Sequence, residues 1–487
     1  MKRDFKRFLK FPIIGFCCLV VLVCWALASP PGSNSDDEYH LAGIWCAHGE
    51  QTQICSIDES TGQKSVPRQI QRYSGPQGFF CYVGNEKASS RCIRELSPEV
   101  VLELYPTGRI SEGQYPSGFY KANGLLVSGD ISWSILKMRF LQVSLAMLVF
   151  IAALFTARKN VTQILSVLFI GFVPIGLWVV PSTQPGSWAI TGLVSLIIYL
   201  IGLTQSKTKV NLIIILVGSS FSVFLAMQSR RDSILTLLIV LVLFLISQYG
   251  IIFGQPIQRF MRVFVPTLFL SVTALVHFRF RSLGSLFQWS GFTETNVFEG
   301  VLSIAPSVVI GLIGGSMQLG SPDFAPPLIV PLLMTIGLGT YLASVWPATT
   351  KETRASAVVG GVLLFALPLR FFLENVGSPV SRYIYVIYLG SLILIAVSTK
   401  VGIADALNHR VISNRVILFS VAMAHAFAFH QTLRRYVSGT NTSRFDLNFG
   451  AEWWWTRGPS PMSVWLIGSV SFSIAMSLTL PISKVRR

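Results

Sequence analysis

Long apolar runs recur along almost the whole chain, and they constrain the fold more than any other feature. Each run has about 17–22 residues, the length of a helix that crosses the hydrocarbon core of a bilayer. Hydrophobic residues make up 52% of the 487 residues and charged residues only 13%, whereas a soluble protein carries about 25% charged residues. The sequence therefore predicts an all-α, polytopic membrane protein.

The runs predict about twelve membrane-spanning helices. A further apolar segment, 298–316, is interrupted by Pro306 and three glycines, and we interpret it as re-entrant, because irregular backbone in a membrane must lie against protein or a water-filled cavity. Ala26-Leu27-Ala28 resembles a signal-peptidase site, but the rest of the chain is membrane-embedded, so we favour a retained first helix. The predicted spans are 11–29, 138–156, 162–180, 188–204, 210–227, 234–253, 263–278, 327–346, 356–373, 383–398, 413–431 and 463–481.

The formal net charge of +17 comes largely from short segments between the predicted spans. Arg158, Lys159, Lys207 and Lys209 are examples. Basic residues in short loops mark the cytoplasmic side, so we expect a multi-pass protein of the plasma membrane with both termini in the cytoplasm. No nucleic-acid-binding motif accompanies the charge, which makes the lipid bilayer, and not a nucleic acid, the expected partner.

Residues 30–136 form one long hydrophilic segment, which this topology places outside the cell. It contains Cys46, Cys55, Cys81 and Cys92. An even number of cysteines in an outward-facing loop favours disulfides, and pairing of neighbours would give Cys46–Cys55 and Cys81–Cys92. A zinc site is the alternative, although these spacings do not fit the usual zinc motifs. We expect a single membrane domain over 1–487 that includes a 30–136 subdomain.

Polar residues gather at the outer ends of the predicted spans. A carboxylate there can act as a general base or hold a divalent cation, Mg²⁺ or Mn²⁺. An arginine fork matches phosphate oxygens, and aromatic side chains can stack on sugar rings. Together these are the parts of an enzyme that takes a sugar from a lipid-phosphate carrier. The candidates are Asp36, Asp37, Glu38, His40, Arg230, Arg231, Asp232, Arg279, Arg281, Asp323, Arg382, Arg434, Arg435 and the run Trp453-Trp454-Trp455.

Each of these features also has a purely structural interpretation. Acids beside a span can cap a following helix, and Arg230-Arg231-Asp232 can be a solvated turn. Arg434-Arg435 can bind lipid headgroups, and the three tryptophans can form an interfacial aromatic belt. His425 and His430 lie within a predicted span, where helix packing is a more common role than a proton relay.

Eight short stretches also resemble those of a known family. They are "PPGSNSDDEYHLAGIWC", "SVPRQI", "YPSGFYKANGLL", "QSRRDS", "LGSPDFAPP", "VSRYIYV", "LRRYVSGTN" and "WWW". In this order they resemble a bacterial membrane family catalogued as domain of unknown function 2142, which groups with the GT-C glycosyltransferases. The resemblance implies a GT-C-like fold and a polyprenyl-phosphate sugar as donor.

The resemblance also implies that an acid in the first outer loop is the catalytic base or a metal ligand. That role falls to Asp36 or Asp37, with Glu38 as a further candidate. The usual Ser-Pro-Asp-Glu is replaced by Asn34-Ser35-Asp36-Asp37-Glu38, so the register of the pair is ambiguous by one residue. An expected Trp-Leu-Asp appears as Ser321-Pro322-Asp323, which makes Asp323 a secondary candidate.

The leading hypothesis is an integral-membrane glycosyltransferase that moves a sugar from a polyprenyl-phosphate donor to an envelope glycan, glycolipid or protein at the outer membrane face. Arg230, Arg231, Arg382 or Arg434 would hold the donor phosphate. The main alternative is a transporter or a lipid or glycolipid flippase, which twelve spans suit equally well, although the sequence has no clear internal repeat. A glycan polymerase or ligase and a non-catalytic assembly partner are further alternatives.

Overall fold

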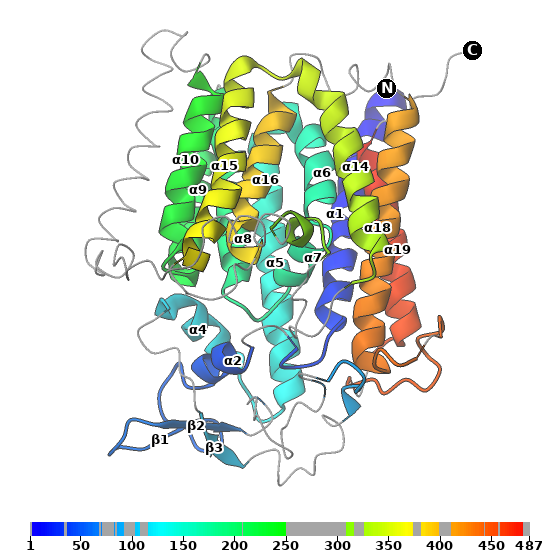
Figure 1. The fold of residues 1–487 in the computed structure, drawn as a ribbon. Coiled ribbons are helices and arrows are strands. Elements are labelled where there is room, and N and C mark those ends of the chain that lie inside the picture. The colour runs from blue at the N-terminus through cyan, green and yellow to red at the C-terminus, as the bar shows by residue number, and fades with distance from the viewer. Residues whose placement is uncertain are drawn as a thin grey trace.

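The structure is a computed structural model, and the chain folds into a bundle of long helices with a small layer at one end (Figure 1). Helix α1 begins and helix α19 ends at the opposite end of the bundle (Figure 1). The residues that the structure describes are 2–33, 37–67, 70, 82, 85–91, 103–107, 115–206, 208–249, 308–315, 326–373, 381–398, 411–442, 444–455 and 458–480.

The bundle is built from the apolar runs of the sequence. Two short 3₁₀ turns, Arg158–Asn160 and Trp346–Ala348, connect neighbouring helices at its far end. The helices are α1 (Lys2–Leu27), α5 (Ile131–Thr156), α6 (Val161–Gly171), α7 (Ile175–Val179), α8 (Gly186–Gln205), α9 (Lys209–Ser229), α10 (Ser233–Ser247), α14 (Ile329–Val345), α15 (Lys351–Leu373), α16 (Ser381–Val397), α18 (Val411–Val437) and α19 (Pro461–Thr479).

Eight helices among the described residues are long and apolar enough to cross a membrane. The apolar parts of α10 and α16, Ser233–Ser247 and Ile384–Val397, are shorter. The predicted span 162–180 is divided into α6 and α7, because Pro174 cannot continue a helix that precedes it. The predicted span 263–278 lies outside the described residues. The polytopic helical fold is thus confirmed, while the number twelve stays a prediction.

The segment interpreted as re-entrant is described only at 308–315. Residues 308–312 are helical. Gly314 follows with φ +88°, and a Cβ there would lie 2.7 Å from Cδ of Pro174, at the break between α6 and α7. This part of the chain therefore packs against an interrupted helix, as irregular backbone within a membrane must.

Helix α8 lies at the centre of the bundle, since 94% of its most apolar stretch is buried inside the protein. Its packing on α9 is very close: a Cβ on Gly192 would lie 2.4 Å from the carbonyl oxygen of Ser222. The hydroxyls of Ser195 and Ser222 are 2.9 Å apart and hydrogen-bond across the same contact. Small residues and hydroxyl pairs are the usual means of holding helices together in lipid.

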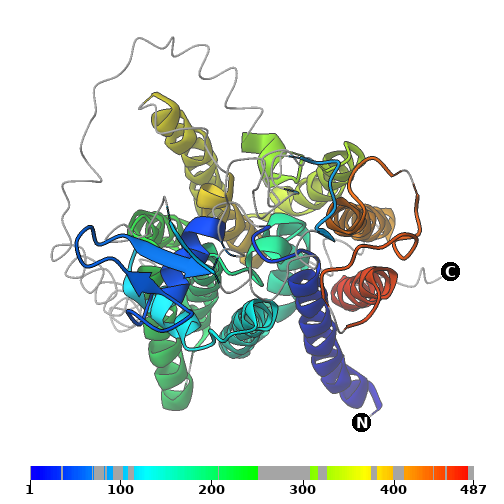
Figure 2. The same cartoon turned by 90° about the horizontal axis from the view of Figure 1, so that it is seen from below.

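The layer at the other end, here called the cap, contains α2 (Asp37–Trp45), α4 (Ser117–Gly124) and a small sheet (Figures 1 and 2). The antiparallel strands run in the order β1 (Ser56–Ile57), β2 (Lys64–Pro67) and β3 (Leu104–Pro106). An apolar cluster joins the cap to the bundle, since its buried members include Ile44 and Phe119 of the cap and Trp188 of α8. The cap comes from the hydrophilic segment 30–136.

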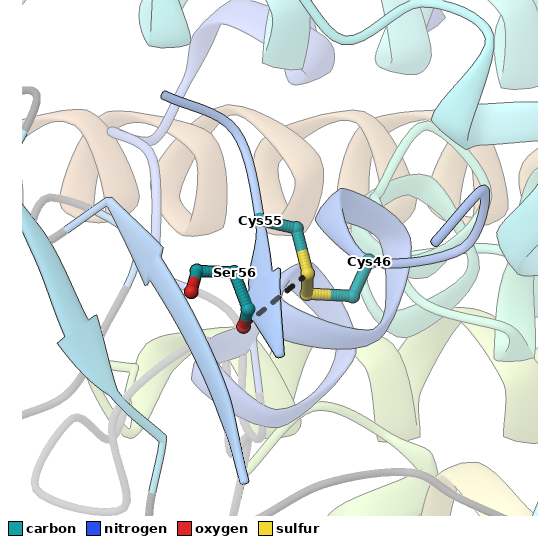
Figure 3. The surroundings of a disulfide bond; sticks show 3 residues. All are labelled: Cys46, Cys55 and Ser56. Carbon is teal, nitrogen blue, oxygen red and sulfur yellow. Dashed lines mark hydrogen bonds between the residues drawn. A yellow bond between two sulfur atoms is a disulfide. The ribbon is translucent and has the colours of Figure 1, made fainter. Parts of the chain in front are cut away.

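A disulfide joins Cys46 to Cys55 and so ties the end of α2 to the start of β1 (Figure 3). This confirms the first predicted pair and excludes zinc for these two cysteines. Cys81 and Cys92 lie outside the described residues, and their pairing stays a prediction. Cys17 and Cys24, in the first apolar run, are buried and unpaired.

Candidate functional site

The chain leaves α1 through a buried segment, residues 28–33, here called the strap. Arg139 of α5 holds its start. Its Nη1 donates to the carbonyl oxygens of Ala26 and Ser29, each over 2.7 Å, and its Nη2 donates to that of Pro30 over 3.1 Å. The last carbonyls of a helix have no partner within the helix, and a guanidinium supplies charge-assisted donors to them. Arg139 thus fixes the direction in which the chain leaves α1.

Three further side chains, from distant parts of the sequence, also hold this exit. The hydroxyl of Tyr82 donates to the carbonyl of Pro31 over 2.5 Å, and that of Tyr436 donates to Ser33 over 3.3 Å. The indole N–H of Trp455 donates to Leu27 over 3.1 Å. Burial raises the pKa of Tyr82 well above its ordinary value, so its phenol stays protonated and remains a donor.

The strap leads toward the acidic stretch, in which Asp37 is the acid whose side chain the structure describes. Asp37 is the first residue of α2 and is fully buried. Its Oδ1 accepts a hydrogen bond from the hydroxyl of Thr183 over 3.1 Å. It also interacts electrostatically with Arg139. The amino end of a helix and a nearby arginine both favour a negative charge. Asp37 therefore does lie at the start of a helix, as the structural interpretation of the acids proposed. This position is also compatible with a role of its carboxylate in catalysis.

Asp36 lies outside the described residues. Glu38 belongs to α2, but its side chain is outside the described part.

His40, one turn further along α2, is buried in a group of aromatic rings. Its Nδ1 lies 2.8 Å from the hydroxyl of Tyr120. Its ring meets Tyr39 and Tyr115 edge to face, with centroids 5.3 and 5.1 Å apart. We call Tyr39, His40, Tyr115 and Tyr120 the aromatic cluster. The guanidinium of Arg230 lies 5.8 Å from the ring of Tyr115, so the cluster extends from α2 to the end of α9.

Arg230 and Asp232 form a bidentate pair in the turn between α9 and α10. Nε of Arg230 lies 2.8 Å from Oδ1 of Asp232, and Nη2 lies 3.0 Å from Oδ2. Both residues line a small pocket at the cap end of the bundle. Gln184, the residue after Thr183, lines it too. The remaining lining residues are Val179, Gly186, Ala189, Ile190, Leu193, Ser233, Thr236 and Val386.

The structure therefore brings together four of the predicted residues: Asp37, His40, Arg230 and Asp232. The connection between α7 and α8 joins them, since Thr183 binds Asp37 and Gln184 lines the pocket of Arg230. We refer to these residues, with the aromatic cluster, as the candidate site.

The two arginines at the end of α18 lie elsewhere. Arg435 is fully buried and donates to the carbonyl oxygens of Tyr82, Asn85 and Ala88 over 2.5, 3.1 and 2.8 Å. Arg434 donates to the carbonyl of Thr440 over 3.0 Å. These bonds hold loops at the cap end of the bundle, so we do not carry either arginine forward as a phosphate ligand.

The remaining candidates have varied positions. Arg231 is exposed beside Arg230. Arg382 belongs to α16, but its side chain is outside the described part of the chain. Asp323, Arg279 and Arg281 lie wholly outside the described residues. Trp453, Trp454 and Trp455 are each less than 9% exposed. They pack inside the protein, where Trp455 donates to the carbonyl of Leu27 at the end of α1, so the alternative interpretation of an interfacial belt at these residues is wrong.

Some site residues that the sequence analysis did not single out nevertheless had a recognisable signal in the sequence. Arg139 is a charge within an apolar run, which usually marks a buried or functional group. Tyr115 and Tyr120 lie within the stretch "YPSGFYKANGLL". Thr183, Gln184 and Tyr82 carried no such signal, because only the folded chain brings them to the strap and to α2.

The described part of the chain has no group of three or more histidine, cysteine or acidic side chains placed to hold a metal ion. Asp37 and Asp232 are the described carboxylates of the candidate site.

The comparisons with known proteins agree with this description of the chain. The family described as predicted membrane protein DUF2142 matches residues 19–287. The matched part includes α2, the aromatic cluster, Thr183 and Arg230, and so contains the whole candidate site. Neither curated proteins nor solved structures gave a match. Because the family match covers more than half of the sequence, the chain belongs to the DUF2142 family of predicted membrane proteins.

Proposed function

We propose that this protein is an integral-membrane glycosyltransferase that moves a sugar from a polyprenyl-phosphate donor to a cell-envelope acceptor at the outer membrane face. One observation carries the proposal. The buried carboxylate of Asp37 is connected through Thr183 and Gln184 to a pocket lined by Arg230 and Asp232. A base and a phosphate-binding group thus lie at the same end of the bundle, which is where a lipid phosphate would reach.

Asp37 is the proposed base. A general base must come within hydrogen-bonding distance of the hydroxyl that it deprotonates. Asp37 already accepts a hydrogen bond from one hydroxyl, that of Thr183. An acceptor sugar hydroxyl that takes the place of Thr183 would meet the same oxygen in the same geometry. Asp36 remains the alternative base, one residue away.

Arg230 is the proposed ligand of the donor phosphate. The planar fork that holds two oxygens of Asp232 also matches two oxygens of a phosphate. Asp232 thus occupies the position that the phosphate would take, and it would be displaced or would share the fork. The aromatic rings beside Arg230 offer a surface on which a sugar ring can stack.

Mass spectrometry of the envelope glycans tests the proposal. The host is compared as wild type, as a deletion, and as a deletion complemented with Asp37→Asn. The matched control is Asp58→Asn, which changes an exposed acid in the cap. We expect the deletion and Asp37→Asn to lack one sugar and Asp58→Asn to restore it, with equal amounts of each variant in the membrane. Full restoration by Asp37→Asn would remove Asp37 from the mechanism.

The transporter or flippase remains the second candidate, and His425 favours it. His425 lies within the span Ser413–Val437, is fully buried and accepts a hydrogen bond from the indole N–H of Trp25 over 3.0 Å. An ionisable residue inside a membrane protein often belongs to a transport pathway. A periodate reagent that does not cross membranes separates the two functions. In the deletion strain, a missing transferase leaves the lipid-linked sugar at the outer face, where periodate oxidises it, whereas a missing flippase leaves it protected inside.

A further inference from the structure

The connection between α18 and α19 exposes two large apolar side chains. Phe445 and Phe449 are both 62% exposed, although neither belongs to a membrane-spanning helix. Their backbone is well held: Oδ1 of Asp446 accepts from the N–H of Asn448 over 2.9 Å, and Oδ1 of Asn448 accepts from the N–H of Met462 over 3.1 Å. A turn held by hydrogen bonds therefore directs the two rings outward. We call residues 444–450 the phenylalanine turn.

The phenylalanine turn borders the apolar surface of the bundle. The ring of Phe445 stacks on His430 of α18, with centroids 4.9 Å apart, and meets Trp465 of α19 edge to face at 5.3 Å. Next to Trp465, α19 exposes apolar side chains along its length, at Leu466, Ile467, Val470 and Ile474. Figure 2 shows the connection at the periphery of the bundle, outside the ends of both helices. The exposed rings thus lie where the lipid-facing surface ends.

Arg444 gives the turn an amphipathic character. Its guanidinium lies 3.7 Å from the centroid of the exposed ring of Phe449. A cation above an aromatic ring matches the boundary between headgroups and acyl chains, where the charge meets phosphate and the ring meets hydrocarbon. In water, by contrast, two exposed rings would each forgo the gain from burial of their apolar surface.

We propose that the phenylalanine turn is a membrane anchor in the headgroup layer of the bilayer. Phe445 and Phe449 enter the acyl boundary, and Arg444 binds the phosphate of a phospholipid. The same connection holds the end of α1, which leads into the strap, because Trp455 donates to the carbonyl of Leu27. The anchor therefore fixes the depth of the strap, and of the acids that follow it, relative to the lipid phosphates. The inference does not depend on the proposed transferase.

Spin labels in nanodiscs of phosphatidylcholine and phosphatidylglycerol test this depth. The host variant has Cys17, Cys18, Cys24, Cys81 and Cys92 changed to alanine and keeps the Cys46–Cys55 disulfide. One label replaces Phe449, one replaces Glu59 in the exposed β1–β2 turn, and one replaces Ile467 on α19. We expect the label at 449 to resemble that at 467, with high collision rates for oxygen and low rates for a water-soluble nickel chelate. Equal nickel accessibility at 449 and 59 would overturn the proposal.

Native mass spectrometry tests the phosphate contact separately. Arg444→Gln is compared with the unchanged protein, and Lys87→Gln, which changes an exposed cation at the same end of the protein, is the control. We expect Arg444→Gln to retain fewer phosphatidylglycerol molecules and Lys87→Gln to retain as many as the unchanged protein. Equal retention by all three would refute the role of Arg444 in binding phosphate.

Discussion

The hydroxyl of Thr183 donates to Oδ1 of Asp37 over 3.1 Å, and this hydrogen bond joins the first turn of α2 to the connection between α7 and α8. Both side chains are fully buried. The bond thus links the acidic stretch to the pocket that Gln184 and Arg230 line. Arg230 itself lies about 200 residues after Asp37 in the chain.

Removal of this hydroxyl will weaken the cap and the activity together. Thr183→Val keeps the shape of the side chain but removes one hydrogen-bond donor from a buried carboxylate, at a cost of about 1–3 kcal/mol. Thr183→Ser retains the hydroxyl and serves as the control. Thermal unfolding in detergent and glycan analysis of complemented strains measure the two effects. A Thr183→Val variant as stable as Thr183→Ser would show that the bond contributes nothing.

Arg139 will be among the most sensitive positions in the protein. Arg139→Met removes three donors from buried carbonyls at the end of α1, each worth about 1–3 kcal/mol. Arg139→Lys keeps the charge but not the planar fork, so we expect a partial loss. The control is Lys159→Gln, which changes an exposed cation at the far end of the bundle. Urea or thermal unfolding checks the order of stability, and equal stability of Arg139→Met and Lys159→Gln would contradict it.

The disulfide will hold the cap but not the bundle. Cys46 and Cys55 are nine residues apart, and a bridge that closes such a short loop contributes about 2–4 kcal/mol. We expect the double variant Cys46→Ser/Cys55→Ser to be cleaved in the cap at protease concentrations that leave the helices of the bundle intact. Gel shifts with a maleimide polymer on the unfolded protein check the bond itself. Labelling of Cys46 or Cys55 before reduction would show that the bridge is absent.

The close packing of α8 and α9 will not accept a methyl group. A Cβ at Gly192 would lie 2.4 Å from the backbone oxygen of Ser222, so Gly192→Ala must push the helices apart. We expect a loss of about 1–3 kcal/mol. Gly339→Ala in α14 is the matched control, because its Cβ would meet nothing within 4 Å. Similar unfolding temperatures for the two variants would mean that α8 and α9 adjust without cost.

The sequence by itself determined the class of protein and much of the positions of its helices. Apolar runs of membrane length leave few alternatives to spanning helices, because each backbone polar group must be paired inside its own segment. The same pattern placed the hydrophilic segment that forms the cap, and the spacing of Cys46 and Cys55 indicated the first disulfide. These features are local, so a few neighbouring residues are enough to specify them.

Only the tertiary structure decided which polar residues lie together. Asp37 and Arg230 share the candidate site, whereas Arg435, an equally plausible phosphate ligand in the sequence, is buried against the carbonyls of a loop about 350 residues away. Trp455 supports Leu27 across 428 residues instead of facing lipid. Such pairings follow from how the helices pack, and hydrophobic periodicity within one segment carries no information about its distant partners.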